Sequence, residues 1–96
     1  MTEQKADEAA QAHVRAVVVG DASRMVRDMT PEALAKAMKI GNTTWNFLGY
    51  ELTSEEWDGD DYVFEVAYET DLGDLKMRQR LRLVDGAWKI VDVERI

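Results

Sequence analysis

The stretch that decides the fold is residues 62–83, which read YVFEVAYETDLGDLKMRQRLRL. Two runs within it, 62–70 and 75–83, alternate large or apolar residues with other, mostly charged, residues. Alternation with a period of two over this length is typical of β-strands that bury one face. One polar residue, Gln79, interrupts the apolar series of the second run. The stretch therefore predicts two neighbouring strands with a shared apolar face and one polar side chain on that face.

Turn sequences on both sides extend this pair into a four-stranded antiparallel meander, with strands near 46–57, 61–70, 74–84 and 87–95. Asp85-Gly86 is a two-residue hairpin turn of the kind that tolerates positive φ. It aligns the last two strands so that Leu83 pairs with Trp88, Leu81 with Ile90 and Gln79 with Asp92. This register places Asp92 on the apolar face, beside Gln79.

The register of the other strands follows from the same reasoning. With Leu72-Gly73 as the turn, the second and third strands pair Glu69 with Lys76, Glu65 with Arg80, Tyr68 with Met77 and Phe64 with Leu81. Opposite charges and apolar residues then face one another, which favours this alignment over a slip by one residue. A three-residue loop at 58–60 places Leu48, Tyr50 and Leu52 of the first strand on the apolar face.

The first part of the chain is predicted to be helical. A helix over 2–19 has an arc of alanines and valines that includes His13, and Gly20 is its stop. Asp21 is the expected N-cap of a short helix over 22–28, with Met25 and Val26 facing inward. Thr30-Pro31 starts a third helix that ends near residue 40. The fold class is therefore α+β: one domain, 1–96, with N-terminal helices packed on a curved four-stranded antiparallel meander sheet.

The composition excludes several classes of protein. The chain has no cysteine and one histidine, so it has neither a disulfide framework nor the ligands of a transition-metal site. A net charge of −7 disfavours binding to nucleic acid. No apolar run is long enough to cross a bilayer, and the polar N-terminus does not resemble a signal peptide. We therefore expect a cytoplasmic protein that needs no cofactor and binds neither nucleic acid nor membrane.

The polar residues on the predicted inner surface are the candidate site. His13 is either a buried histidine satisfied by one hydrogen bond or a general acid or base. Asp92 is either a carboxylate bonded to Gln79 or a proton acceptor whose pKa is raised by apolar surroundings. The two candidate catalytic residues are therefore Asp92 and His13. The residues expected to line the pocket are Tyr50, Tyr68, Met77, Gln79 and Trp88.

The opposite face of the predicted sheet mixes charged pairs with four apolar residues: Val63, Ala67, Val91 and Val93. Such a mixture suits an interface between the sheets of two subunits. An ordinary exposed face with surface salt bridges, each worth about 0.2–1 kcal/mol, is the alternative. We expect a homodimer formed through this face.

Several segments resemble the NTF2-like superfamily, also described as SnoaL-like with a cystatin-like fold. These segments are Val18-Val-Gly-Asp21, Met29-Thr-Pro-Glu32 and the closing stretch 83–93, LVDGAWKIVDV, with its Gly-x-Trp-Lys-Ile segment. The resemblance implies a cone-shaped sheet around helices, an internal pocket and dimerisation through the sheet. It also implies one of two kinds of protein. Some members are enzymes, such as ketosteroid isomerases, polyketide cyclases and dehydratases, and others are non-catalytic binding or assembly modules.

Three functions follow from these observations. The first, which we favour because the polar pocket residues are few, is a small non-catalytic homodimeric module that binds a small apolar ligand or a protein partner. The second is a proton-transfer enzyme of isomerase, cyclase or dehydratase type that acts on an apolar carbonyl or polyketide-like substrate, with Asp92 as base. The third is an adaptor that binds a protein through Arg78 and Arg80 on the charged sheet face. Because fold does not determine function, the arrangement of the pocket residues has to decide among them.

Overall fold

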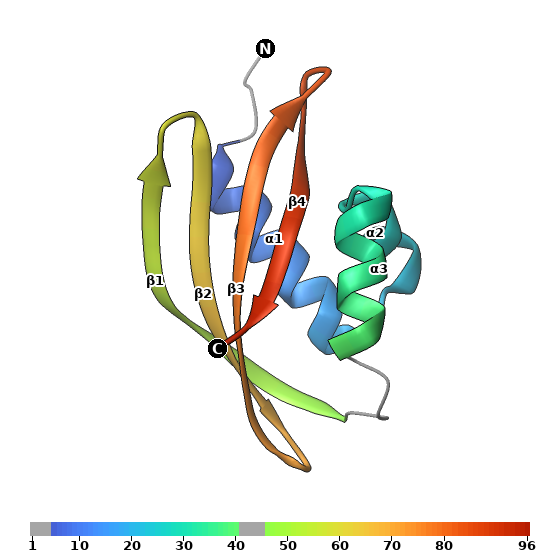
Figure 1. The fold of residues 1–96 in the computed structure, drawn as a ribbon. Coiled ribbons are helices and arrows are strands. Elements are labelled where there is room, and N and C mark those ends of the chain that lie inside the picture. Colours follow the sequence, from blue (N-terminus) through green and yellow to red (C-terminus); the bar gives the residue numbers. More distant parts are fainter. Residues whose placement is uncertain (1–4, 41–45) are drawn as a thin grey trace.

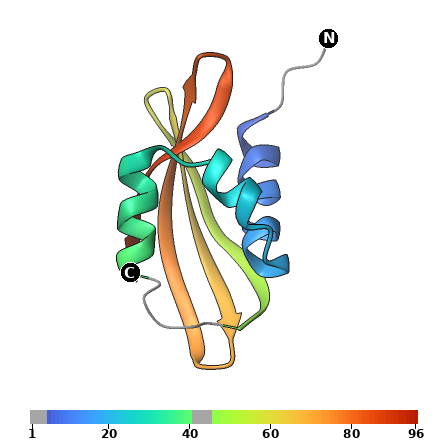
Figure 2. The ribbon, with the colours of Figure 1, turned by 90° about the vertical axis from the view of Figure 1, so that its right-hand side faces the viewer.

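The computed structural model describes residues 5–40 and 46–96. It has the predicted α+β architecture, with three helices followed by a four-stranded antiparallel meander in the order β1-β2-β3-β4 (Figure 1). The helices are α1 (Ala6–Val19), α2 (Ala22–Arg27) and α3 (Pro31–Ile40), and the strands are β1 (Phe47–Asp58), β2 (Asp61–Thr70), β3 (Gly73–Val84) and β4 (Ala87–Arg95). Figure 2 shows that the helices all lie on one side of the sheet.

Local sequence explains where the helices begin and end. Helix α1 begins at Ala6, because Lys5 has an extended backbone and serves as its N-cap; the predicted residues 2–4 lie outside the described residues. Gly20 ends α1 with φ of 79°, a conformation that favours glycine. Asp21 caps α2 by accepting a hydrogen bond from Arg24 N, and Thr30 Oγ1 accepts one from Ala33 N at the start of α3. The predicted caps are therefore confirmed.

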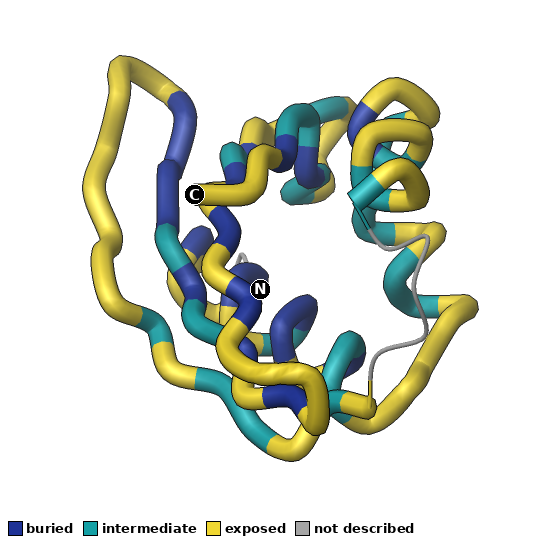
Figure 3. The backbone as a smooth tube through the Cα atoms, turned by 60° about the horizontal axis from the view of Figure 1, so that its bottom comes forward, coloured by how far each residue is buried: buried dark blue, intermediate teal, exposed yellow. Residues whose placement is uncertain are grey.

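The core lies between the apolar arc of α1 and the inner face of β2 and β3. The small residues Ala6, Ala9 and Ala10 of α1 are buried and let the helix approach the sheet closely, against β1 and β2. From the sheet, large side chains fill the space, and those buried most completely are Phe64, Val66, Tyr68, Leu81 and Ile90. Figure 3 shows the sheet curving around the helices, with exposed residues at the hairpin tips and along much of β1. The predicted alternation of β2 and β3 thus forms the inner wall of the core.

The β2–β3 register differs from the prediction by two residues. The turn consists of Asp71 and Leu72, and Thr70 is paired with Gly73, so Glu65 lies opposite Arg78 and Phe64 opposite Gln79. The pairings of Glu69 with Lys76, Glu65 with Arg80, Tyr68 with Met77 and Phe64 with Leu81 are therefore wrong. Gly73 has φ of 106°, and Thr70 Oγ1 accepts from Leu72 N within the turn. Because a shift of two preserves the pleat, every side chain keeps its predicted face.

A bulge in β4 overturns the predicted position of Asp92. Leu83 pairs with Trp88 and Leu81 with Ile90, as predicted, but Val91 is then an extra residue in the strand. Asp92 consequently lies opposite Arg80 on the outer face, and Val93 lies opposite Gln79 on the inner face. The pairing of Gln79 with Asp92, and the outer position predicted for Val93, are both wrong.

Strand β1 also contains bulges. Its loop to β2 has two residues, since Asp58 pairs with Asp61, and an irregularity between Leu52 and Ser54 restores the alignment that a longer loop would have given. Tyr50 and Leu52 pack against the core as predicted. A second irregularity between Phe47 and Gly49 puts Phe47 against the core and leaves Leu48 exposed, which corrects the prediction for Leu48.

Candidate functional site

A cavity of about 450 Å³ lies between the helices and the inner face of the sheet. All three helices, the segment between α2 and α3, and all four strands contribute to its lining. The lining residues are His13, Val17, Ala22, Met25, Val26, Met29, Leu34, Ala37, Met38, Ile40, Phe47, Tyr68, Leu75, Met77, Gln79 and Val93. Met38 and Val26 are mostly exposed, so the cavity opens to solvent beside α2 and α3. A volume of this size lies within the usual range for small-molecule sites.

Methionine is concentrated in this cavity. The chain has five methionines, and four of them line it: Met25, Met29, Met38 and Met77. The unbranched thioether side chain adapts its shape to what it contacts and is common on binding surfaces that accept varied apolar partners. The lining therefore suits an apolar group without imposing one narrow shape.

His13 lies on the cavity wall and contacts Asp28, which the sequence analysis did not identify. Its side chain is almost fully buried, and His13 Nδ1 lies 3.3 Å from Asp28 Oδ2. Arg24 Nε donates to the same carboxylate oxygen at 3.4 Å. This contact fixes the orientation of the imidazole and leaves Nε2 as the ring nitrogen that a ligand would meet.

The backbone explains how Asp28 reaches His13. The segment after α2 adds to the edge of β4 through a parallel bridge between Met29 and Ile90. Ile90 N donates to Asp28 O at 2.7 Å, and Thr30 N donates to Ile90 O at 2.9 Å. Burial raises the pKa of the Asp28 carboxyl, but the hydrogen bond and charge of His13, with a smaller contribution from Arg24, outweigh burial and hold this pKa below its ordinary value. Asp28 is therefore ionised at neutral pH.

Tyr68 and Gln79 bring two further polar groups to the cavity. Their exposed fractions are 1% and 3%. Tyr68 Oη and Gln79 Oε1 are buried and have no hydrogen-bond partner among the described residues. Burial raises the pKa of the Tyr68 hydroxyl well above its ordinary value, and the nearby Gln79 side chain offsets part of this rise without forming a hydrogen bond of normal geometry. The hydroxyl is therefore protonated and able to donate.

The structure brings together some of the predicted site residues and separates others. His13, Tyr68, Met77 and Gln79 line the same cavity, as predicted. Tyr50 is half-buried and borders a shallow depression on the sheet with Glu51, Ala67, Glu69 and Asp74. Trp88 borders a separate surface cleft beside α2. These two predicted lining residues therefore belong to other surfaces.

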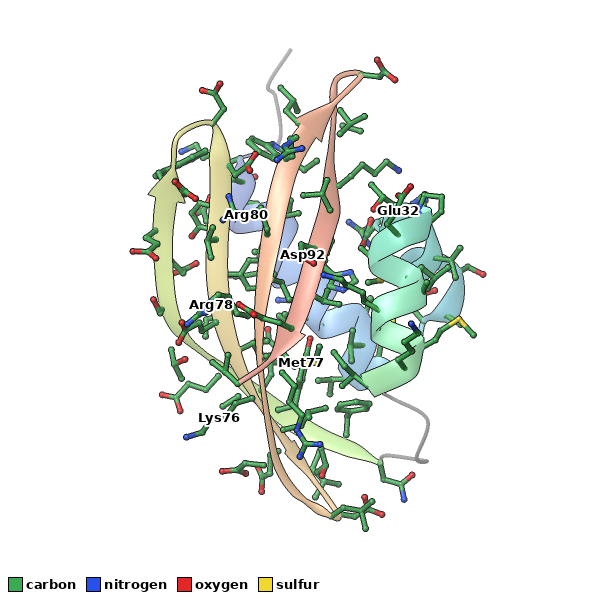
Figure 4. All side chains as sticks on the ribbon, viewed as in Figure 1. Glu32, Lys76, Met77, Arg78, Arg80 and Asp92 are labelled. Atoms are coloured by element: carbon green, nitrogen blue, oxygen red, sulfur yellow. The ribbon has the colours of Figure 1, made fainter. Side chains whose placement is uncertain are left out.

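Asp92, the predicted base, lies outside the cavity. Its half-exposed carboxylate accepts a hydrogen bond of 2.6 Å from Lys36 Nζ on α3. Figure 4 shows Asp92 on β4 next to α3, on the sheet surface that also carries Arg78 and Arg80. Because Asp92 contacts neither His13 nor Gln79, the arrangement required for the predicted catalytic pair of Asp92 and His13 is not formed.

The outer face of the sheet carries paired charges. Arg78 contacts Glu65 and Glu94 at 2.9 and 2.8 Å. Asp61 accepts from both Arg80 and Arg82, at 2.9 and 2.8 Å. Hydrogen bonds from Arg82 and then Arg80 lower the pKa of Asp61 to about 2. The guanidinium groups on this face therefore already have partners within one chain.

Among residues 5–40 and 46–96, no group of acidic or histidine side chains could hold a metal ion, and no helix is long and apolar enough to cross a membrane. No family model, no curated protein and no solved structure matches the chain.

Proposed function

We propose that this protein is a small NTF2-like binding module that holds a small apolar ligand in the cavity between its helices and sheet. The order of the elements, helices first and then a curved meander sheet, supports this family assignment. The cavity is the observation that carries the proposed function. Its walls are apolar except for three almost fully buried polar side chains, those of His13, Tyr68 and Gln79. A few convergent polar groups in an apolar cavity are typical of sites that bind and orient a small molecule.

A fluorescent probe tests this proposal. N-phenylnaphthylamine is uncharged and apolar, and it gains fluorescence when it leaves water. We expect it to bind the folded protein with one site. The variant Ala37→Trp fills the cavity from α3 and should weaken binding at least about tenfold, because the indole occupies space that the ligand needs.

Ala35→Trp is the matched control. It makes the same substitution on the same helix, but Ala35 is exposed and does not line the cavity. The control should bind the probe as the native protein does. Equal binding by native protein and Ala37→Trp would show that the probe binds elsewhere, and the proposal would then fail.

We further propose that the protein forms a homodimer through the outer face of its sheet. A two-fold interface requires a self-complementary surface, and this face carries rows of both charge signs, with Arg78 beside Glu65 and Glu94. Sedimentation equilibrium should give about twice the chain mass of 10.9 kDa. Ala67→Arg, which adds a charge between these rows, should dissociate the dimer. A native protein that sediments as a monomer at high micromolar concentration would contradict this proposal.

A proton-transfer enzyme is the second candidate, and the contact of His13 with Asp28 favours it. A carboxylate at Nδ1 holds an imidazole in one orientation, as a general base requires. Tyr68 Oη, protonated and unpartnered among the described residues, could donate to a carbonyl oxygen that becomes negative. The substrate class would be an apolar carbonyl compound, with His13 as the base in place of Asp92 and Asp28 orienting its imidazole.

Exchange of a carbon-bound proton tests the enzyme directly. The native protein should accelerate deuterium uptake at the α-carbon of cyclohexanone, followed by NMR, and His13→Gln and Asp28→Asn should both abolish the acceleration. If the native protein binds N-phenylnaphthylamine but does not accelerate exchange of this probe ketone, the non-catalytic module is favoured.

A further inference from the structure

The two unpartnered atoms in the cavity specify the chemistry of a ligand head group. Gln79 Oε1 is an acceptor, and Tyr68 Oη both donates and accepts. Both are buried without a partner among the described residues, although buried polar atoms in folded proteins are almost always hydrogen-bonded. A ligand that satisfies both must therefore supply a donor to Gln79 and a group that pairs with Tyr68.

The two groups lie close enough for one head group. Tyr68 on β2 and Gln79 on β3 project from the same inner face, with the pair Val66–Met77 between their positions in the ladder. The Gln79 side chain approaches the Tyr68 hydroxyl closely enough to influence its pKa. A single hydroxyl can donate to one of them and accept from the other.

The described lining of the cavity favours an uncharged head group. Its described lining contains no lysine, arginine, aspartate or glutamate. The carboxylate of Asp28 is not part of this lining, and its Oδ2 lies 3.3 Å from His13 Nδ1. A ligand carboxylate would lose its hydration, find no lysine or arginine on the described wall and face the lone pairs of Gln79 Oε1.

We propose that the cavity is built for an uncharged ligand with a hydroxyl head group on an apolar body, its hydroxyl donating to Gln79 Oε1 and accepting from Tyr68 Oη. This inference rests on the proposed binding function and adds the class of ligand. The four methionines surround the apolar body, and the opening beside α2 and α3 admits it.

Three probes with the same chain test the head group by displacement of N-phenylnaphthylamine. Octanol donates and accepts, octyl methyl ether only accepts, and octanoate is charged. Octanol should bind about three- to tenfold more tightly than the ether, which corresponds to one net hydrogen bond. Octanoate should bind at least about tenfold more weakly than octanol, because no lysine or arginine of the described lining compensates its desolvation.

The variant Gln79→Met provides the internal control. It keeps the length and flexibility of the side chain but removes the amide acceptor, so the preference for octanol over the ether should fall to about one. Tyr68→Phe should weaken binding of octanol and of the ether alike and leave the preference unchanged, because both probes accept from the Tyr68 hydroxyl. If either variant does not fold, the ratios measured on the native protein still decide the question.

Two results would overturn the inference. Equal affinity of the native protein for octanol and the ether would show that no donor is recognised. Tighter binding of octanoate than of octanol would show that a cation serves the head group. The proposed function would fail in a different way. In that case none of the three probes would displace N-phenylnaphthylamine, or binding of N-phenylnaphthylamine would not depend on the cavity.

Discussion

Replacing Tyr68 by phenylalanine should stabilise the ligand-free protein. Tyr68 is one of the most completely buried large side chains, and its hydroxyl has no hydrogen-bond partner among the described residues. Burying a hydroxyl without a partner costs about 1–3 kcal/mol in mutational data. Phenylalanine keeps the ring, including its edge contact with Phe47 at a centroid distance of 5.2 Å, and loses only the oxygen. After allowing for the small void left by that oxygen, we expect the free energy of unfolding to rise by about 1 kcal/mol.

The same chemical change at Tyr62 is the matched control, with the opposite sign. Tyr62 is also buried, but its hydroxyl donates to Glu55 Oε1 at 2.6 Å. Tyr62→Phe removes a hydrogen bond to a charged acceptor and should lower the free energy of unfolding by about 1–2 kcal/mol. The two variants should therefore bracket the native protein, about 2–3 kcal/mol apart.

Urea denaturation followed by circular dichroism measures both variants. The protein must first be unfolded and refolded in ligand-free buffer, because a bound ligand would satisfy the Tyr68 hydroxyl and stabilise the native state. A change of 1 kcal/mol corresponds to a shift of about 4–8 °C in Tm for a domain of this size. If Tyr68→Phe were destabilised as much as Tyr62→Phe, the Tyr68 hydroxyl would have a partner in solution and the argument for a ligand hydroxyl would lose its basis.

Three further substitutions test other parts of the structure. Asp61→Asn should lower the free energy of unfolding by about 1 kcal/mol at neutral pH. Because Arg82 and Arg80 lower the pKa of Asp61 in the folded protein from 3.8 to about 2, urea titrations should show this difference disappearing as pH falls from about 4 to about 2. Ala10→Leu should destabilise the protein by about 1–3 kcal/mol in the same assay, since Ala10 is fully buried where α1 meets the sheet. Asp92→Asn removes a half-exposed ion pair with Lys36, so it should cost less than about 1 kcal/mol and leave the octanol affinity unchanged by displacement titration.

Period and turn chemistry were sufficient to predict the architecture. The alternation of residues 62–83 specified a shared inner face, and an error of two residues in the β2–β3 register left that face intact. The Asp85-Gly86 turn was predicted from its residue types, and both residues have positive φ, 50° and 80°. Such features are local, so the sequence is enough to recognise them.

The composition of the site depended on features that are not local. The contact between His13 and Asp28 joins residues 15 positions apart, across two helices and a turn. Asp28 follows a six-residue helix, where an acidic residue ordinarily needs no explanation. The one signal that could have suggested it was the need of a buried histidine for a partner, which does not identify the residue that supplies it.

The predicted position of Asp92 was wrong for a related reason. The stretch Ile90-Val91-Asp92-Val93 places two apolar residues in succession, so a period of two can be continued through it in either of two ways. A regular strand keeps Asp92 inside, and a bulge at Val91 moves it outside. Local sequence alone does not decide between these alternatives.

The energetics of the whole cavity do decide between them. In the regular strand, an ionised Asp92 would be buried beside Gln79 with no lysine or arginine among the described lining residues, which costs several kcal/mol. With the bulge, the inner position is filled by Val93, whose burial contributes about 1.5–3 kcal/mol, and Asp92 meets Lys36 at the surface. Both contributions favour the bulged strand, and together they outweigh the cost of disrupting one position of the β-ladder. The bulge at Val91 moves the predicted base to the surface and so leaves the described cavity lining without a carboxylate. With no lysine or arginine there either, the unpartnered acceptor of Gln79 favours a ligand hydroxyl over a carboxylate.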